Sequence, residues 1–436
     1  MSLLIKASFA LAPHIANGLA KGIYVLCGSV IRDTATNNVL GFLRGTTQTP
    51  KSSHNILNLI ISGANLLTSG ANIAVSAKGF SNINQRLDKE FGDVNQQLGN
   101  IENQIRAIGK PLQISPQLLQ ISSAGSVLNL GVSVMGFAVI SQRLNEIENQ
   151  LKQAAELLNK INRKIDLSFY ANFHAGIELA VNAFTMTKIE NRRSSALQAI
   201  NRFLEAEHIY KDYTINELSN KSPIIDKYIL TLSLAYIAEA RCHLELEEHE
   251  TALRRFQEGG KFIRLLLKKY IELMLTSNPA AYLHPQFKGQ IDLHKLTQIY
   301  QWIDPNFDEN TVFEMQRENI FKLTQSHDEW LSSLPSAIVD RSEIQWGIFG
   351  GNPTPFTGRF EKEAYKRLPQ VFEVMESMIE TNRRFESYQT ELQAISQLGI
   401  SFHDWLKLTP STEIKPDGTE LMYIIPSKPL ELQPSI

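Results

Sequence analysis

This chain has few cysteines and almost no net charge. Only two cysteines, Cys27 and Cys242, occur in 436 residues, and they lack the spacing of a zinc site or a disulfide framework. Lysine plus arginine (43) nearly equals aspartate plus glutamate (45), so net charge favours neither nucleic acid nor an anionic surface. These features argue against a disulfide scaffold, a zinc module or a nucleic-acid-binding protein, and they fit a reducing compartment.

Linear catalytic motifs are missing as well. The chain contains no GxxxxGK[ST] phosphate loop, GxSxG nucleophile elbow, HExxH zinc helix or EF-hand calcium loop. We therefore expect no enzymatic activity, no cofactor and no metal. An enzyme stays open as an alternative, because catalytic residues do not need a linear motif.

The most specific feature that is present is a duplication. Residues 75–87 read VSAKGFSNINQRL, and residues 132–144 read VSVMGFAVISQRL. Each copy begins with a long apolar run rich in small residues and then changes into a charged helix with heptad spacing. We interpret residues 51–168 as two such modules in tandem.

The apolar halves of the modules carry no charge over helical lengths. Residues 56–77 lie between Lys51 and Lys78, and no charged residue occurs between Lys110 and Arg143. Small residues at close spacing allow helices to approach one another. The glycines that we select as membrane or assembly candidates are Gly63, Gly70, Gly79, Gly125, Gly131 and Gly136.

The charged halves follow a coiled-coil seam, with apolar residues at alternating spacings of three and four. In the first copy the seam residues are Leu87, Phe91, Val94, Leu98, Ile101 and Ile105. In the second copy they are Leu144, Ile147, Leu151, Leu158, Ile161 and Ile165. Seams this narrow need a partner helix, either within the chain or in another subunit.

Two interpretations of the apolar halves remain open. Each run, residues 56–77 and 118–140, has about the 20 residues that a helix needs to cross a hydrocarbon core. Against this, Asn58, Asn65 and Asn72 fall seven residues apart, and amides in mid-membrane are costly unless they are paired. A soluble bundle in which other helices bury these runs would show the same composition.

The chain ends predict a small sheet. We expect a folded N-terminal helix rather than a cleaved signal peptide, because Pro13 would directly follow the cleavage site. Residues 22–45 then read as a β-hairpin, and residues 412–425 read as a second one. An isolated hairpin is marginal in water. The two hairpins are therefore expected to combine and to bring the ends of the chain together.

Residues 169–400 predict a globular helical body. Its segments 227–247 and 250–275 form an antiparallel helix pair with packing residues at Ala240, Ala252, Phe256 and Gly259. This pair, over residues 227–275, resembles one tetratricopeptide-like helical hairpin, without the tryptophan and proline of that pattern. In broad layout the modules also look like α-helical pore-forming toxins, although no motif carries that likeness.

Four further candidates in the body have ordinary structural explanations. His243 and His249 lie among glutamates at helical spacing, but no second cluster completes a metal site. The basic helix 254–269 has interleaved glutamates, which favours ion pairs over an anionic partner. Asp304 and Asp308 are expected to cap a helix. The loop 350–358 could hold a ligand, but its glycines are also explained by conformation.

We therefore predict a mainly α protein: an elongated helical bundle or coiled-coil module plus a globular helical body, with a small β-sheet formed by the N- and C-terminal hairpins. The predicted domains are 1–50, 51–168, 169–400 and 401–436. The predicted function is non-enzymatic, a self-assembling helical protein that conditionally inserts into or perturbs membranes, such as a pore-forming toxin or defence effector. The alternative is a soluble scaffold or adaptor that oligomerises through the coiled coil and binds a protein partner.

The expected partners follow from these functions: a second copy of the chain, a lipid membrane, or a protein bound to the helical body, but no nucleic acid. The expected location is the cytoplasm for the soluble form, with membrane association on activation.

Overall fold

A computed structural model describes residues 9–10, 13–45, 137–159, 168–220, 222, 224–276, 278–283, 287, 291–325, 359–408, 421–426 and 428–432. These parts are mostly helical, with one small sheet, which confirms the predicted fold class. The predicted loop 350–358 and both apolar runs up to residue 136 lie outside them.

The predicted helix pair 227–247 and 250–275 corresponds closely to α9 and α10. The long helices are α6 (Phe137–Asn159), α7 (Ser168–Thr185), α8 (Ile189–Ser219), α9 (Ile225–Glu245), α10 (His249–Met274) and α14 (Arg359–Leu398). The shorter ones are α1 (Pro13–Ala20), η1 (Pro279–Leu283), α11 (Leu293–Ile303), α12 (Glu309–Gln325) and α15 (Phe402–Lys407). The sequence did not predict α15.

Side-chain caps define several helix starts. Asp292 accepts a hydrogen bond from the backbone N–H of Lys295 at the start of α11, and Asp308 accepts one from Thr311 at the start of α12, with N···O distances of 2.8 and 2.7 Å. Asp308 therefore caps a helix, as predicted. A helix end is also marked by its residue type. Gly399 directly follows α14 and has φ +60°, the left-handed conformation typical of a C-terminal cap.

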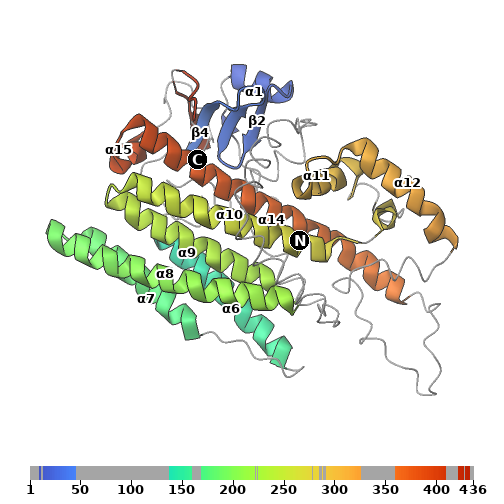
Figure 1. The fold of residues 1–436 in the computed structure, drawn as a ribbon, viewed down its shortest axis with the longest axis horizontal. Helices are drawn as coiled ribbons and strands as arrows, with labels where there is room; N and C mark the ends of the chain where they lie inside the picture. Colours follow the sequence, from blue (N-terminus) through green and yellow to red (C-terminus); the bar gives the residue numbers. More distant parts are fainter. Residues whose placement is uncertain are drawn as a thin grey trace.

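The central helix of the body is α9. It packs against α8, α10, α6 and α7, and successive long helices lie side by side in Figure 1. Most of its side chains are buried around its whole circumference, which is typical of a helix enclosed by others. Apolar and small residues occur on every face of α9, which explains why this helix rather than a neighbour occupies the centre.

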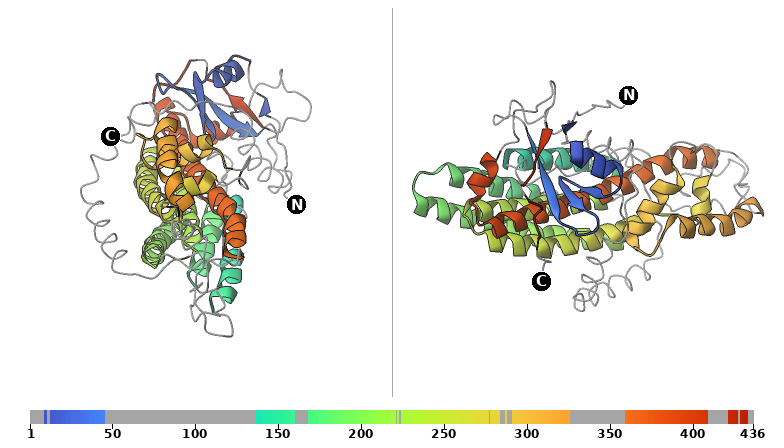
Figure 2. Two further views of the ribbon diagram at one scale, coloured as in Figure 1. Left: turned by 90° about the vertical axis from the view of Figure 1, so that its right-hand side faces the viewer. Right: turned by 90° about the horizontal axis from the view of Figure 1, so that it is seen from above.

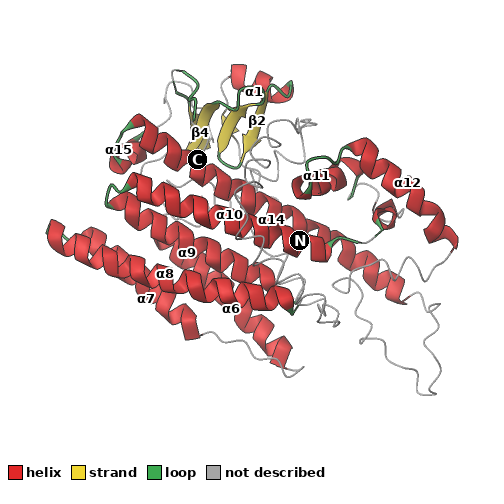
Figure 3. Ribbon diagram, in the orientation of Figure 1, coloured by secondary structure: helices red, strands yellow, loops and turns green. Residues whose placement is uncertain are grey.

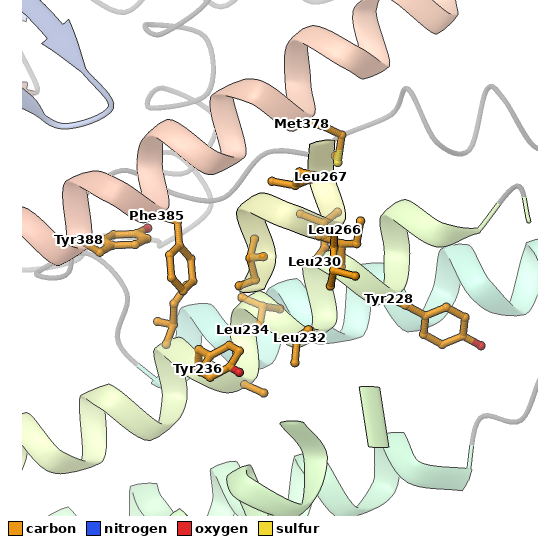
Figure 4. Close-up of a cluster of buried hydrophobic side chains, with 14 of the residues drawn as sticks. Tyr228, Leu230, Leu232, Leu234, Tyr236, Leu266, Leu267, Met378, Phe385 and Tyr388 are labelled. Atoms are coloured by element: carbon orange, nitrogen blue, oxygen red, sulfur yellow. The ribbon is translucent and has the colours of Figure 1, made fainter. Parts of the chain in front are cut away.

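The contact of α9 and α10 is unusually close at one point. A Cβ atom on Gly259 would lie 2.5 Å from the Tyr236 ring, so glycine is required there. Helix α14 packs against α10 nearby: Phe385 of α14 stacks on Phe256 of α10 with ring centroids 4.1 Å apart. Figure 4 shows leucines of α9 and α10 in the same buried cluster as Tyr236 and as Phe385 and Met378 of α14.

The sheet joins the two ends of the chain. Its strands are β1 (Phe9–Ala10), β2 (Tyr24–Cys27), β3 (Val30–Asp33), β4 (Val39–Gly45) and β5 (Leu421–Ile424). Their order is β1-β5-β4-β3-β2, antiparallel except for the short parallel pair β1-β5. The segment predicted as an N-terminal hairpin is thus a three-stranded meander of β2, β3 and β4. Strand β5 pairs with β4, which confirms that both ends of the chain contribute to one sheet.

The sheet lies against α14, on the opposite side of the body from α7 (Figures 1 and 2). Gly28, at the turn between β2 and β3, has φ +58°, and a Cβ there would lie 3.0 Å from Cα of Arg384. Ser29 Oγ donates to Ser387 Oγ at 3.1 Å, and Arg32 donates to Thr390. The turn therefore docks directly on the α14 backbone. Figure 3 shows how small the sheet is relative to the helical body.

Candidate functional site

Most residues that the sequence selected lie outside the described parts of the chain. These are the glycines Gly63, Gly70, Gly79, Gly125, Gly131 and Gly136, and the seam residues Leu87, Phe91, Val94, Leu98, Ile101, Ile105, Ile161 and Ile165. Leu158 belongs to α6, but its side chain is not described. Their roles remain predictions.

The described part of the second seam packs within its own chain. Leu144, Ile147 and Leu151 are buried in the core of the body. The helix that carries them, α6, packs against α9 and α7, and Phe137 at its start stacks on Phe184 of α7 with ring centroids 5.8 Å apart. This stretch of the seam therefore has its partner helices in the same molecule.

Both ends of residues 46–136 are held by the folded body. β4 ends at Gly45, which pairs with Leu421 of β5. α6 begins at Phe137, and Phe137 and Ile140 are buried. The segment that carries the apolar runs therefore begins and ends on the same folded unit.

A cluster of buried charges lies where α8, α9 and α10 meet. Arg255 Nε is 2.8 Å from Glu239 Oε1 of α9, and its Nη2 is 2.7 Å from Glu207 Oε2 of α8. The remaining nitrogen, Nη1, is 2.8 Å from Glu258 Oε2 on α10 itself. Glu207 and Glu239 are each 1% exposed. One guanidinium group thus joins three helices through charge-assisted hydrogen bonds.

Two more basic side chains flank this cluster. Lys211 Nζ lies 5.2 Å from the ring centroid of Tyr236 and 5.5 Å from that of Phe262, within cation–π range. His243 Nε2 lies 3.6 Å from Glu239 Oε1. Burial lowers the pKa of Lys211, and the neighbouring Glu207 opposes that shift.

The environment drives the pKa values of the two buried glutamates in opposite directions. Burial, followed by a hydrogen bond with Glu239, raises the pKa of Glu207 to about 9. Burial also opposes ionisation of Glu239, but hydrogen bonds with His243, Glu207 and Arg255 outweigh it and lower its pKa to about 2. The surroundings thus favour a proton on Glu207 and the ionised form of Glu239.

The cluster is better suited to holding helices than to acid–base chemistry. Its carboxyl groups are enclosed by three helices, so an external substrate would reach them only if the helices separated. Sequence reasoning missed this cluster because Glu207 and Glu239 lie 48 and 16 residues from Arg255. The available signal was Glu239, the one charged residue between Lys227 and Arg241 of α9.

The histidines at the α9–α10 turn do not keep helical spacing with the neighbouring glutamates. α9 ends at Glu245 and Glu247 has φ +59°, so the helical spacing of His243 with Glu247 and of Glu245 with His249 is lost. Instead Glu247 accepts the backbone N–H of Phe402 at 3.0 Å and contacts His249 at 2.8 Å. Among the described residues no group of three or more potential ligands is placed to hold a metal ion.

The basic helix carries ion pairs, as predicted. Arg254 contacts Glu258 at 2.9 Å, and Arg264 contacts Glu386 of α14 at 3.2 Å while lying 5.1 Å from the Trp302 ring centroid. Arg255 also pairs with the buried glutamates Glu207 and Glu239, which the sequence did not predict.

In the parts of the chain that the structure describes, no helix combines the length and the apolar character that a bilayer crossing requires. No protein-family model, curated protein or solved structure matches this chain.

Proposed function

We propose that this chain is a non-enzymatic, self-assembling helical protein whose residues 51–136 insert into or perturb membranes under a specific condition, while the helical body anchors them. The observation that carries the proposal is the placement of two uncharged, helix-length runs in one segment that is fixed to the body at both ends. The pore-forming, coiled-coil and oligomeric character of the protein all belong to this proposal.

The fixed ends constrain how such a segment could enter a bilayer. A chain that leaves and returns to a body on one side of a membrane must cross an even number of times. Two runs, residues 56–77 and 118–140, satisfy this condition as an antiparallel pair. Because all backbone groups of a crossing segment need internal hydrogen bonds, both would cross as helices.

The second run overlaps the body at its end. Phe137 and Ile140 belong to α6 and are buried, so they stay with the body unless α6 detaches. Residues 118–136 alone still have roughly the length that a crossing helix needs. Insertion therefore does not require α6 to leave its site.

Dye release from liposomes tests this proposal. We expect the wild-type chain to release dye under an activating condition, and Gly70→Asp and Gly131→Asp to abolish release, because a buried charge in the hydrocarbon core is costly. Asn172→Asp, on an exposed position of α7, adds the same charge and should leave release unchanged. Absence of lipid association under every lipid composition and pH assayed would contradict the proposal.

A soluble scaffold or adaptor is the second candidate. The packing of Leu144, Ile147 and Leu151 within the chain supports it, because this part of the seam is buried without a membrane; oligomerisation would then use the remaining seam residues. The tetratricopeptide-like hairpin, now α9 and α10, would then contribute to binding a protein partner. Native mass spectrometry separates the candidates: both propose self-assembly, but only the first expects the assembled mass to depend on lipid.

The proposed location follows from the function. The soluble form would reside in the cytoplasm, in keeping with its two unpaired cysteines, and would associate with a membrane on activation.

A further inference from the structure

Two oxygen atoms in the charge cluster have no donor among the residues that the structure describes: Glu207 Oε1 and Glu239 Oε2. The other oxygen of each carboxyl group accepts from Arg255. The two carboxyl groups contact neighbouring nitrogens of one guanidinium group, Nε and Nη2 of Arg255, so they lie close to one another. Two ionised carboxylates this close repel each other, whereas a carboxylic acid can donate a hydrogen bond to a carboxylate.

The charge balance leads to the same conclusion. Arg255 already divides its guanidinium among Glu207, Glu239 and Glu258. A second full negative charge at 1% exposure would be poorly compensated there, and buried carboxyl groups in that situation take up a proton.

We propose that Glu207 and Glu239 share one proton and that this proton locks α8, α9 and α10 together, so that the helical body loosens as pH rises. The groups that face the pair come from all three helices, and Phe385 of α14 contributes an apolar contact through Tyr236. The titratable and charged groups are Lys211 on α8, Tyr236 and His243 on α9, and Arg255 and Glu258 on α10.

The direction of the pH dependence follows from the two pKa shifts. The pKa of Glu207 rises from 4.5 to about 9 in the folded chain, so its contribution to stability is complete below pH 4.5 and is lost as pH rises to about 9. The pKa of Glu239 falls to about 2, so its contribution is complete above pH 4.5 and is lost as pH falls toward 2. The cluster therefore stabilises the body most in mildly acidic solution, and acidification to pH 5 does not open it.

Replacing Glu207 by glutamine tests the shared proton. The amide NH2 group would donate to Glu239 and its oxygen would accept from Arg255, so Glu207→Gln reproduces the protonated carboxyl group at every pH. We expect the full-length variant to melt at or above the wild-type temperature at pH 7, and this difference to grow from pH 5 to pH 9. Glu205→Gln makes the same chemical change at an exposed position of the same helix and should keep the wild-type pH dependence.

The reciprocal variant gives the opposite result. Glu239→Gln removes the anion that pairs with Arg255 and His243, so it should melt below Glu207→Gln at each pH. At pH 7 the infrared band of a protonated buried carboxyl group should be present in the wild type and missing in Glu207→Gln.

The proposal is overturned if Glu207→Gln and Glu239→Gln lower the melting temperature equally. It is also overturned if the difference between Glu207→Gln and the wild type does not change with pH. Should Glu239→Gln fail to fold, the comparison of Glu207→Gln with Glu205→Gln decides the question alone. None of these outcomes depends on membrane insertion.

Discussion

Two adjacent glycines on α10 have different surroundings. A Cβ on Gly259 would lie 2.5 to 2.7 Å from three atoms of the Tyr236 ring, whereas a Cβ on Gly260 would meet Phe385 at 3.4 Å, an ordinary contact. Tyr236 is buried and close to the charge cluster, so it has little freedom to move. At this scale a single methyl group separates a tolerated change from a disruptive one.

We therefore expect opposite effects from two neighbouring substitutions. Gly259→Ala should lower the free energy of unfolding by about 1–3 kcal/mol through overpacking. Gly260→Ala should raise it by up to about 1 kcal/mol, because alanine favours the helix over glycine. Urea unfolding of both variants measures this, and equal effects of the two would contradict the close approach of α9 and α10.

At the scale of elements, α6 shows that a heptad seam does not identify its own partner. The spacing of Leu144, Ile147 and Leu151 predicts a helix with one apolar stripe, and the structure confirms the helix. The structure also shows that α6 packs against α7 and α9 of the same chain.

This packing predicts what a truncation in the seam would do. Leu144→Ala should lower the free energy of unfolding by about 2–5 kcal/mol, because Leu144 is fully buried. Its effect on the assembled mass should be nil. Lys152→Ala, at a side chain that is 54% exposed on the same helix, should change stability by less than about 0.5 kcal/mol.

Chemical unfolding together with light scattering separates the two possible partners. A change of mass without a change in the unfolding of the monomer would mean that Leu144 packs against a second subunit instead.

At the scale of the whole molecule, the sheet connects parts of the chain that are far apart in sequence. β4 lies between β3 and β5, and Val39 also exchanges backbone hydrogen bonds with Leu430 at 3.0 and 2.9 Å. The C-terminal segment therefore supplies the hydrogen-bonding partners along one edge of β4.

Removing the chain after Leu408 should expose that side. We expect faster amide hydrogen exchange in residues 39–45, since β4 becomes an edge strand and loses its bonds to β5. Exchange in α9 should stay slow. A chain cut after Leu432 keeps both β5 and the Leu430 bridge and serves as the control. Unchanged exchange in residues 39–45 would contradict the observed strand order.

The local patterns of the sequence were sufficient for several elements. Apolar periodicity predicted the helix pair α9 and α10, Asp308 marked a helix start, and the β-rich runs at both ends predicted a shared sheet. These predictions succeed because helix periodicity, caps and turns depend on residues only a few positions apart. The short helix α15 was missed, because Ser401 caps only a brief run whose docking on Glu247 is a distant contact.

Only the tertiary structure decided which helix is central and which charges meet. The sequence drew attention to the duplicated modules, yet the core of the described body forms around α9. Glu207, Glu239 and Arg255 come together because three long helices pack in one order, and no spacing along the chain encodes that meeting. By itself the sequence determined a helical protein with two uncharged runs and a sheet at its ends. The packing decided that the residues flanking segment 46–136, which carries these runs, belong to one body, and that α8, α9 and α10 meet around Arg255.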